Sequence, residues 1–220
     1  MEDFNWRNFL IGSLVSIIGI TLISFGSALS QAMNMGLDPF TALNQGTADT
    51  FGFTLGNYQL ILNAIILAII AFFNRKILGW GTIFNMVLVG YQIEFFNSWI
   101  SNSFPVDEWS LIIRILITVV AILIFALGVA IYGDADMGVS PYDAIAPVID
   151  ERVSLDYKWV RMIQDIVVVI GAWLIGGPVG IATFITGFFA GPLISFYSDN
   201  ISQPLMDKLG LNIENGGIKQ

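Results

Sequence analysis

The chain has 220 residues, of which 55% are apolar and 12% are charged, and its net charge is -8. The acidic balance leaves no basic stripe for phosphates and argues against nucleic acid as a partner, while the absence of cysteine and histidine excludes disulfides, thiolate chemistry and the usual metal ligand. Nucleotide-binding motifs are absent as well, so we expect a protein that is not an enzyme and uses no metal or cofactor.

Long uncharged stretches dominate the sequence and indicate a membrane protein. No charged residue occurs between Arg7 and Asp38 or between Arg114 and Asp134. An α-helix needs about 20 apolar residues to cross the hydrocarbon core of a bilayer. In chain order we predict six spans, at residues 9–31, 57–74, 79–99, 111–132, 158–175 and 180–198. The first is too long for the apolar core of a cleavable secretory signal, which has about 7 to 15 residues.

The chain contains an internal duplication. The segment MGLDPFTAL at residues 35–43 returns as MGVSPYDAI at residues 137–145, and the same register of 102 residues aligns Asn63 with Asp165. Self-similarity of this kind predicts a repeat architecture. We therefore divide the chain into a first repeat (8–100), a polar link (101–109), a second repeat (110–200) and a C-terminal tail (201–220).

Two short segments, residues 39–51 and 141–152, follow the duplicated motif. Each begins with a cap and a proline at the first helical position, Asp38-Pro39 and Ser140-Pro141, after a turn at Gly36 or Gly138. A helix of this length spans about 20 Å, against about 30 Å for the hydrocarbon core. We predict two half-helices that either dip inward, with their N-termini toward the midplane, or lie flat at the surface.

The number of spans in each repeat predicts the topology. Three spans per repeat is an odd number, so the second repeat enters the lipid bilayer from the opposite side and the repeats are inverted. Eight basic residues then share one side with both termini, and Arg114 falls on the other. The positive-inside rule places both termini in the cytoplasm. Eight spans would distribute the basic residues nearly as well, so helix length carries this prediction.

Several motifs carry a family resemblance: Gly36-x-x-Pro39, Gly138-x-x-Pro141, Gly79-x-x-Thr82-x-x-Asn85 and Gly191-Pro192 near the end of the last span. With these motifs the chain resembles the YczE/YyaS/YitT-like family of bacterial integral membrane proteins, from about residue 10 to residue 198. The resemblance implies a multi-pass protein of the cytoplasmic membrane. It brings no settled substrate or activity.

Asp165 is the first candidate functional residue. Ten residues separate it from the Gly176-Gly177-Pro178 break, so a span that ends at Ile175 places its carboxylate inside the hydrocarbon. A charge there costs about 2.5 to 3.5 kcal/mol and requires a partner or a cavity. One interpretation is a substrate or proton site shared with Asn63. The other is a structural ion pair with Arg161, which lies one helical turn earlier.

We therefore predict an all-α polytopic membrane protein with six transmembrane helices, two short half-helices and an internal inverted repeat. The leading functional hypothesis is passage of a small solute or ion at the repeat interface, along Asp165, Asn63, Arg161, Asp143, Thr41 and Asn44. The alternative is a membrane scaffold that modulates a partner protein and transports nothing. A transporter needs a hydrated crevice at Asp165 and Asn63, whereas a scaffold has them sealed by pairing. The Gly187-x-x-x-Gly191 motif fits packing within the chain as well as a homodimer contact.

Overall fold

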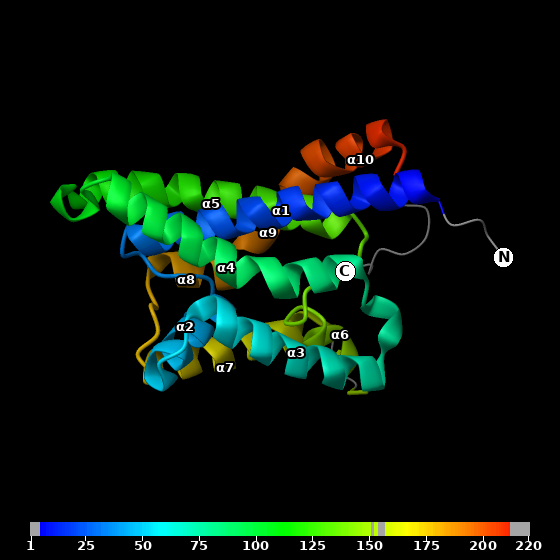
Figure 1. Cartoon of the computed structure of the whole chain (residues 1–220), viewed down its shortest axis with the longest axis horizontal. Helices are drawn as coiled ribbons and strands as arrows, with labels where there is room; N and C mark the ends of the chain where they lie inside the picture. Colours follow the sequence, from blue (N-terminus) through cyan, green and yellow to red (C-terminus); the bar gives the residue numbers. More distant parts are fainter. Residues whose placement is uncertain (1–4, 151, 154–156, 212–220) are drawn as a thin grey trace.

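The computed structural model describes residues 5–150, 152–153 and 157–211, and its regular elements in this part of the chain are all helices (Figure 1). In chain order they are α1 (Trp6–Ala32), α2 (Pro39–Phe51), α3 (Leu55–Phe73), η1 (Arg75–Ile77), α4 (Trp80–Ser103), η2 (Val106–Glu108), α5 (Leu111–Asp134), α6 (Ile145–Asp150), α7 (Tyr157–Leu174), α8 (Ile181–Phe188), α9 (Ala190–Tyr197), η3 (Ser198–Ser202) and α10 (Gln203–Leu209). The prediction of an all-α fold is confirmed.

Three helices of the described chain, α1, α3 and α5, are each long and apolar enough to cross a membrane. A fourth span results if α8 is joined to the segment Ala190–Leu209, from which it is bent by 59°. Large apolar side chains point outward from these helices, such as Leu14, Ile65 and Leu116. A lipid-facing surface explains that exposure, which would be unfavourable in water. Six spans remain a prediction, because helices α4 and α7 are not identified as membrane spans by the same criteria of length and hydropathy.

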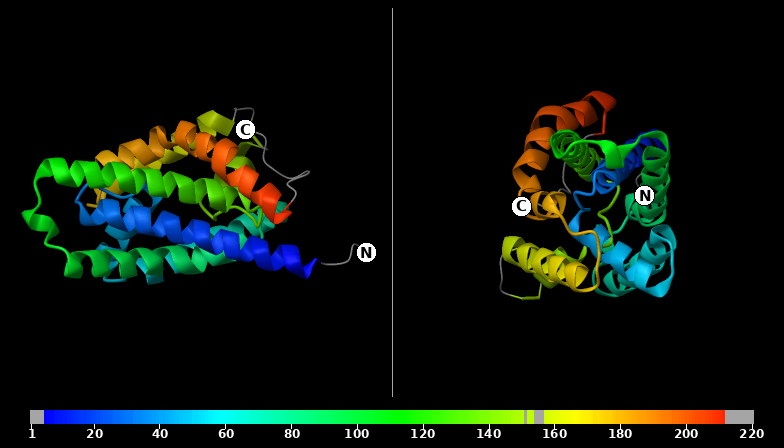
Figure 2. Two further views of the ribbon diagram at one scale, coloured as in Figure 1. Left: turned by 90° about the horizontal axis from the view of Figure 1, so that it is seen from above. Right: turned by 90° about the vertical axis from the view of Figure 1, so that its left-hand side faces the viewer.

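Helices α1 and α5 cross in antiparallel orientation at the centre of the bundle (Figure 2). Glycines allow their backbones to approach closely. A Cβ atom on Gly26 would lie 2.6 Å from the carbonyl oxygen of Ala121, and one on Gly128 would lie 2.6 Å from the amide nitrogen of Ile23. Small residues at helix contacts permit this packing in membranes.

The loop after α1 docks on the start of α8. The carbonyl of Met35 accepts a hydrogen bond from the Ala182 amide (2.9 Å), and the Leu37 amide donates to the carbonyl of Pro178 (3.0 Å). Gly36 between them has φ +96°, and a Cβ there would lie 2.5 Å from the Gly180 amide nitrogen. The turn therefore requires glycine.

The loop after α5 docks on the start of α4 in the same way. The carbonyl of Met137 accepts from the Gly81 amide (2.6 Å), and the Val139 amide donates to the carbonyl of Ile77 (3.2 Å). Gly138 has φ +104°. Each half of the chain thus inserts its glycine turn against the opposite half. The predicted structural roles of Gly36 and Gly138 match this geometry.

The second short segment differs from its prediction. Helix α2 begins at Pro39 and ends at Phe51 as expected, but α6 contains only Ile145–Asp150, and residues 141–144 form a turn. Pro147 explains the difference, because it has no N–H to donate to the carbonyl of Asp143 and its ring would clash with that carbonyl. The corresponding position in α2 is Gln45, whose backbone N–H allows the helix to continue.

The last predicted span is not one straight helix. It is divided into α8 and α9, and a π-helical turn, η3, follows. Pro192 cannot donate to the carbonyl of Phe188, where α8 ends. Helix α10 occupies part of the predicted C-terminal tail, of which residues 212–220 lie outside the described residues.

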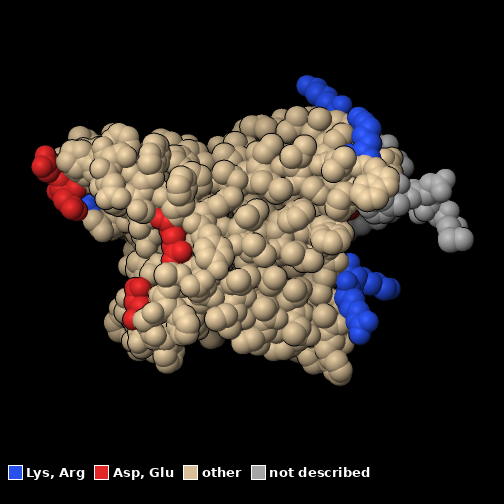
Figure 3. Space-filling model, viewed as in Figure 1, with Lys and Arg blue, Asp and Glu red and all other residues tan. Residues whose placement is uncertain are grey.

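Charged side chains separate toward the two ends of the bundle (Figure 3). On the visible face, most Lys and Arg gather at the end that holds the start of α1, η1 and the end of α10, and Asp and Glu occupy the opposite half. A hydrogen bond from Arg7 Nη2 to the Leu209 carbonyl (3.1 Å) joins α1 to α10 at the basic end. Between the two ends lies a tan surface without charge.

Candidate functional site

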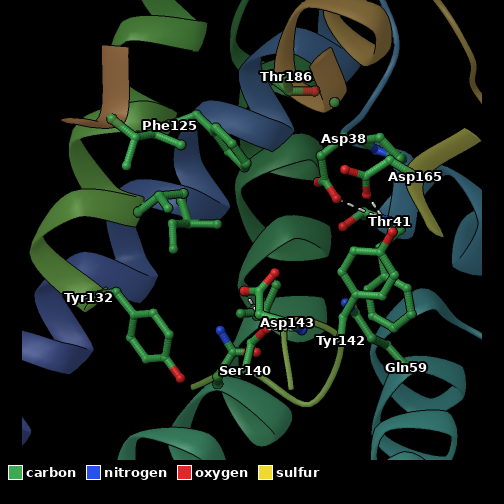
Figure 4. Close-up of a pocket in the computed structure, with 18 of the residues that line it drawn as sticks. Asp38, Thr41, Gln59, Phe125, Tyr132, Ser140, Tyr142, Asp143, Asp165 and Thr186 are labelled. Carbon is green, nitrogen blue, oxygen red and sulfur yellow. Dashed lines mark hydrogen bonds between the residues drawn. The ribbon is translucent and has the colours of Figure 1, made fainter. Parts of the chain in front are cut away.

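A cavity of about 140 Å³ lies in the interior where the two halves of the chain meet (Figure 4). Helices α1 to α5, α7, α8 and α9 all contribute to its walls, together with the turns that precede α2 and α6. Its polar lining consists of Asp38, Thr41, Gln59, Asn63, Asn85, Tyr132, Ser140, Tyr142, Asp143, Arg161, Asp165 and Thr186. A water molecule fills about 30 Å³ of liquid, so the cavity has room for several waters or a small ion.

Many of the residues that line this cavity correspond in the sequence register of 102 residues. The pairs among its lining residues, each 102 positions apart, are Ile23 and Phe125, Asp38 and Ser140, Phe40 and Tyr142, Thr41 and Asp143, Gln59 and Arg161, Asn63 and Asp165, and Asn85 and Gly187. The rings of Phe40 and Tyr142 stack, with centroids 4.4 Å apart and planes 17° from parallel. The cavity therefore lies where equivalent segments of the two halves meet.

Arg161 connects two carboxylates in the second half of the chain. Its Nη1 lies 2.5 Å from Asp143 Oδ1, and its Nε donates to Asp165 Oδ2 at 3.1 Å. Tyr142 donates its hydroxyl to the other oxygen of Asp165 at 2.6 Å. The Asp165 side chain is 5% exposed, so all of its pairing occurs in a nearly closed environment. The structure thus contains the ion pair that the helical spacing suggested.

Asp38 occupies the N-terminus of α2. One carboxylate oxygen accepts from the Thr41 amide (3.0 Å) and the other from the Ser27 hydroxyl (3.3 Å). Within the described part of the chain it forms no ion pair. Ser140, its counterpart, accepts from the Asp143 amide (3.1 Å) and donates its hydroxyl to the Asp143 carboxylate (2.6 Å). Asp38 is therefore the predicted N-cap of α2, whereas Ser140 forms the same kind of contact at the start of the turn at 141–144 and caps no helix there.

Three buried polar atoms of cavity-lining residues have no hydrogen-bond partner among the described residues: Gln59 Oε1, Asn63 Oδ1 and the Tyr132 hydroxyl. Asn63 is 1% exposed and Tyr132 is 5% exposed. Buried polar groups without a partner are uncommon, because each costs about 1 to 3 kcal/mol. Their position makes a bound molecule or ion in the cavity a reasonable expectation.

The predicted pathway residues separate into two groups. Asp165, Asn63, Arg161, Asp143 and Thr41 all line the cavity. Asn44, one turn further along α2 than Thr41, does not line it: its side chain is fully buried and donates to the Phe40 carbonyl at 2.7 Å.

Sequence reasoning missed two lining residues in particular, Tyr142 and Gln59. They are the counterparts of Phe40 and Arg161 in the repeat register, so that register contained a signal for both.

Comparison with known proteins places the chain in a family. The family of unknown function DUF6198 matches residues 11–199. The chain belongs to this family. The uncharacterized membrane protein YczE of Bacillus subtilis is 29% identical over 191 residues, which cover 87% of this chain and 84% of YczE. The uncharacterized protein YyaS of the same organism is 25% identical over 194 residues, covering 87% of this chain and 94% of YyaS.

An uncharacterized protein of Haemophilus influenzae is 23% identical over 189 residues, covering 86% of this chain and 84% of its own length. No solved structure matches the chain. The similarity to YczE and YyaS confirms the family resemblance, and with the apolar helices it supports a membrane protein. The printed names of these relatives assign no substrate or activity.

Proposed function

We propose that this DUF6198 protein carries a small polar solute or ion across the cytoplasmic membrane, with the central cavity as its binding site. The observation that carries the proposal is that a cavity with ionisable walls lies halfway along the long helices. Asp165 is the ninth residue of the 18 in α7, and Asn63 is the ninth of the 19 in α3. Ionisable residues at such depth are expensive and typically mark a transport path.

The inverted repeat is part of this proposal, and three features support it. Helices α1 and α5 correspond in the repeat register and cross in antiparallel orientation. The glycine turns dock reciprocally on the opposite halves. Phe40 and Tyr142 correspond and stack on each other. Binding sites of many secondary transporters lie near the midplane at such a repeat interface, beside broken helices.

Six spans and a cytoplasmic location of both termini complete the proposed topology. Helix α4 has 24 residues and α7 has 18, which correspond to about 36 Å and about 27 Å of helix, enough to cross the core with the other four. The gathering of basic side chains at the end with the start of α1 and the end of α10 supports the cytoplasmic assignment of that end.

One observation agrees with the scaffold alternative: Asp165 is paired with Arg161 and Tyr142. A purely structural site would have its polar groups paired in this way. The unpartnered Asn63 oxygen and Tyr132 hydroxyl favour transport, because a sealed scaffold gains nothing from leaving buried polar atoms unbonded.

Uptake into proteoliposomes tests the proposal. A panel of inorganic ions, amino acids, organic cations and organic anions is screened with the natural protein, with Asp165→Asn and with Asp107→Asn, which changes an exposed carboxylate of η2. Arg161 keeps Asp143 as a partner in Asp165→Asn, so the variant should fold. We expect uptake of at least one solute, about tenfold slower with Asp165→Asn and unchanged with Asp107→Asn. Folded protein that takes up no member of the panel would favour the scaffold.

A further inference from the structure

The cavity holds more negative than positive charge. Asp38, Asp143 and Asp165 contribute carboxylates, and Arg161 is the one cationic side chain among the described lining residues. Arg161 pairs with Asp143 and Asp165 and forms no ion pair with Asp38. Buried charges are unfavourable unless they are paired. The excess negative charge favours occupation of the cavity by a positive ion.

The unpartnered polar atoms provide an independent indication. Asn63 Oδ1 is a hydrogen-bond acceptor without a donor in the described structure, in a residue that is 1% exposed. The Tyr132 hydroxyl is unpartnered as well, and Figure 4 shows it directed toward Ser140 and Asp143 at the lower end of the cavity. Amide and hydroxyl oxygens are the neutral ligands that hard cations accept beside carboxylates.

Two observations narrow the class of ligand. The N-terminus of α2 would attract an anion, but Asp38 already accepts the Thr41 amide there and adds a negative charge of its own. A divalent metal would require closer convergence, and no group of three metal-ligating side chains is found in the described residues. Monovalent cations remain, because they require fewer charged ligands.

We infer that the cavity binds a monovalent cation between Asp38 and Asp143, with oxygen atoms of Asn63 and Tyr132 completing the site. The ion is either an alkali ion or a small organic cation of the ammonium or guanidinium type. This inference rests on the proposed function and names the class of substrate for the same cavity.

Thermal unfolding of the purified full chain in detergent measures binding without transport. The probes are sodium, potassium, ammonium and guanidinium chloride at millimolar concentration. N-methylglucamine chloride at equal ionic strength is the control, because its cation is the bulkiest of the five. One or more small cations should raise Tm in a saturable manner, because a ligand that binds the native state stabilises it. The pattern among the probes distinguishes alkali from organic cations.

Two variants assign the effect to this site. Asp38→Asn keeps a side-chain oxygen for the Thr41 amide and so preserves the cap of α2, but it removes the charge. We expect it to weaken apparent cation affinity about tenfold or more. Tyr132→Phe removes a hydroxyl that has no partner among the described residues, so the variant should fold and weaken the cation affinity severalfold. Asp49→Asn, in an exposed position on the same helix, should behave like the natural protein.

Several outcomes would overturn the inference. One is that no small cation raises Tm more than N-methylglucamine does. Another is that Asp38→Asn and Tyr132→Phe show the same cation-dependent rise in Tm as the natural protein. Uptake of an anionic or neutral solute that is unaffected by Asp38→Asn would also overturn it and leave the proposed transport intact. Saturable cation binding without uptake of any solute would instead support the site and contradict transport.

Discussion

Phe40 and Tyr142 are 102 residues apart in the chain, yet their rings stack with centroids 4.4 Å apart. They occupy corresponding positions of the two repeats, and their chemistry differs by one hydroxyl. That hydroxyl donates to Asp165 at 2.6 Å, whereas the Phe40 side chain has no hydrogen-bond donor for Asn63, the counterpart of Asp165. Corresponding positions of the sequence thus carry different polar groups, and the lining residues Asp143, Arg161 and Asp165 all belong to the second half.

Tyr142→Phe should lower the free energy of unfolding by about 1 kcal/mol, because Asp165 loses a buried hydroxyl donor while the ring stack persists. Denaturant unfolding in detergent followed by circular dichroism measures the change. Tyr91→Phe is the matched control, since its hydroxyl donates to Asn57 Oδ1 at 2.7 Å in an exposed setting and should contribute under about 0.5 kcal/mol. If the two variants lower the free energy of unfolding equally, the buried contact between Tyr142 and Asp165 does not stabilise the fold more than an exposed hydrogen bond does.

Gly36→Ala and Gly138→Ala should each destabilise the fold by about 2 kcal/mol or more, because both positions have positive φ and a Cβ would collide with the opposite half. Gly133→Ala is the control, since a Cβ there meets no described atom within 4 Å and alanine favours the helix. Its Tm should stay equal or rise slightly. If the two turn variants tolerate alanine as well as position 133 does, the reciprocal docking is not required for stability.

Arg114 is a basic residue at the otherwise acidic end of the bundle, where its side chain binds the end of α1. Its Nε and Nη2 donate to the Met33 carbonyl at 2.8 Å and 2.6 Å, at the C-terminus of α1. Arg114→Lys retains the charge but loses the fork, so we expect a loss of about 1 kcal/mol. Arg75→Lys, with a single exposed bond from Nε to the Ala71 carbonyl, should change stability by less than about 0.5 kcal/mol. A Lys that replaces Arg114 at no cost would show that charge alone matters there.

The natural absence of cysteine allows a direct test of the proposed topology. Single cysteines introduced as Lys76→Cys and Asp107→Cys are labelled in intact cells with a membrane-impermeant maleimide. The inverted model expects labelling at position 107, and at position 76 only after the membrane is permeabilised. Both residues are exposed and belong to 3-10 helices at opposite ends of the bundle. A difference in labelling therefore reflects the side of the membrane and not burial of the cysteine. Labelling of both in intact cells would reject the model.

Local sequence signals predicted those parts of the fold that depend on nearby residues. Helix α2 begins at Pro39 after the Asp38 cap, as expected, because the cap, the proline and the first turn lie within four residues. The spacing of Arg161 and Asp165 offered their ion pair as one of two interpretations, because positions i and i+4 share a helix face, and the structure contains that pair. The same kind of signal was available but unused at Pro147 and Pro192, where α6 is shortened and the last span is bent.

The candidate site depended on contacts between distant residues, and its prediction was accordingly incomplete. Asp143 could be placed near a helix start but not against Arg161, 18 residues away across a turn. Asn44 carries polar chemistry like that of the cavity-lining residues, yet in the folded chain it is buried away from the cavity and donates to the Phe40 carbonyl.

By itself, the sequence determined the membrane class, the family and the start of α2, since composition, short motifs and capping act over short separations, and it predicted the duplication. Only the tertiary structure decided that the glycine turns dock on opposite halves, and that Asp38, Asn63 and Asp165 share one cavity. Those relations depend on backbone approach and side-chain direction between segments about a hundred residues apart, which no local pattern specifies.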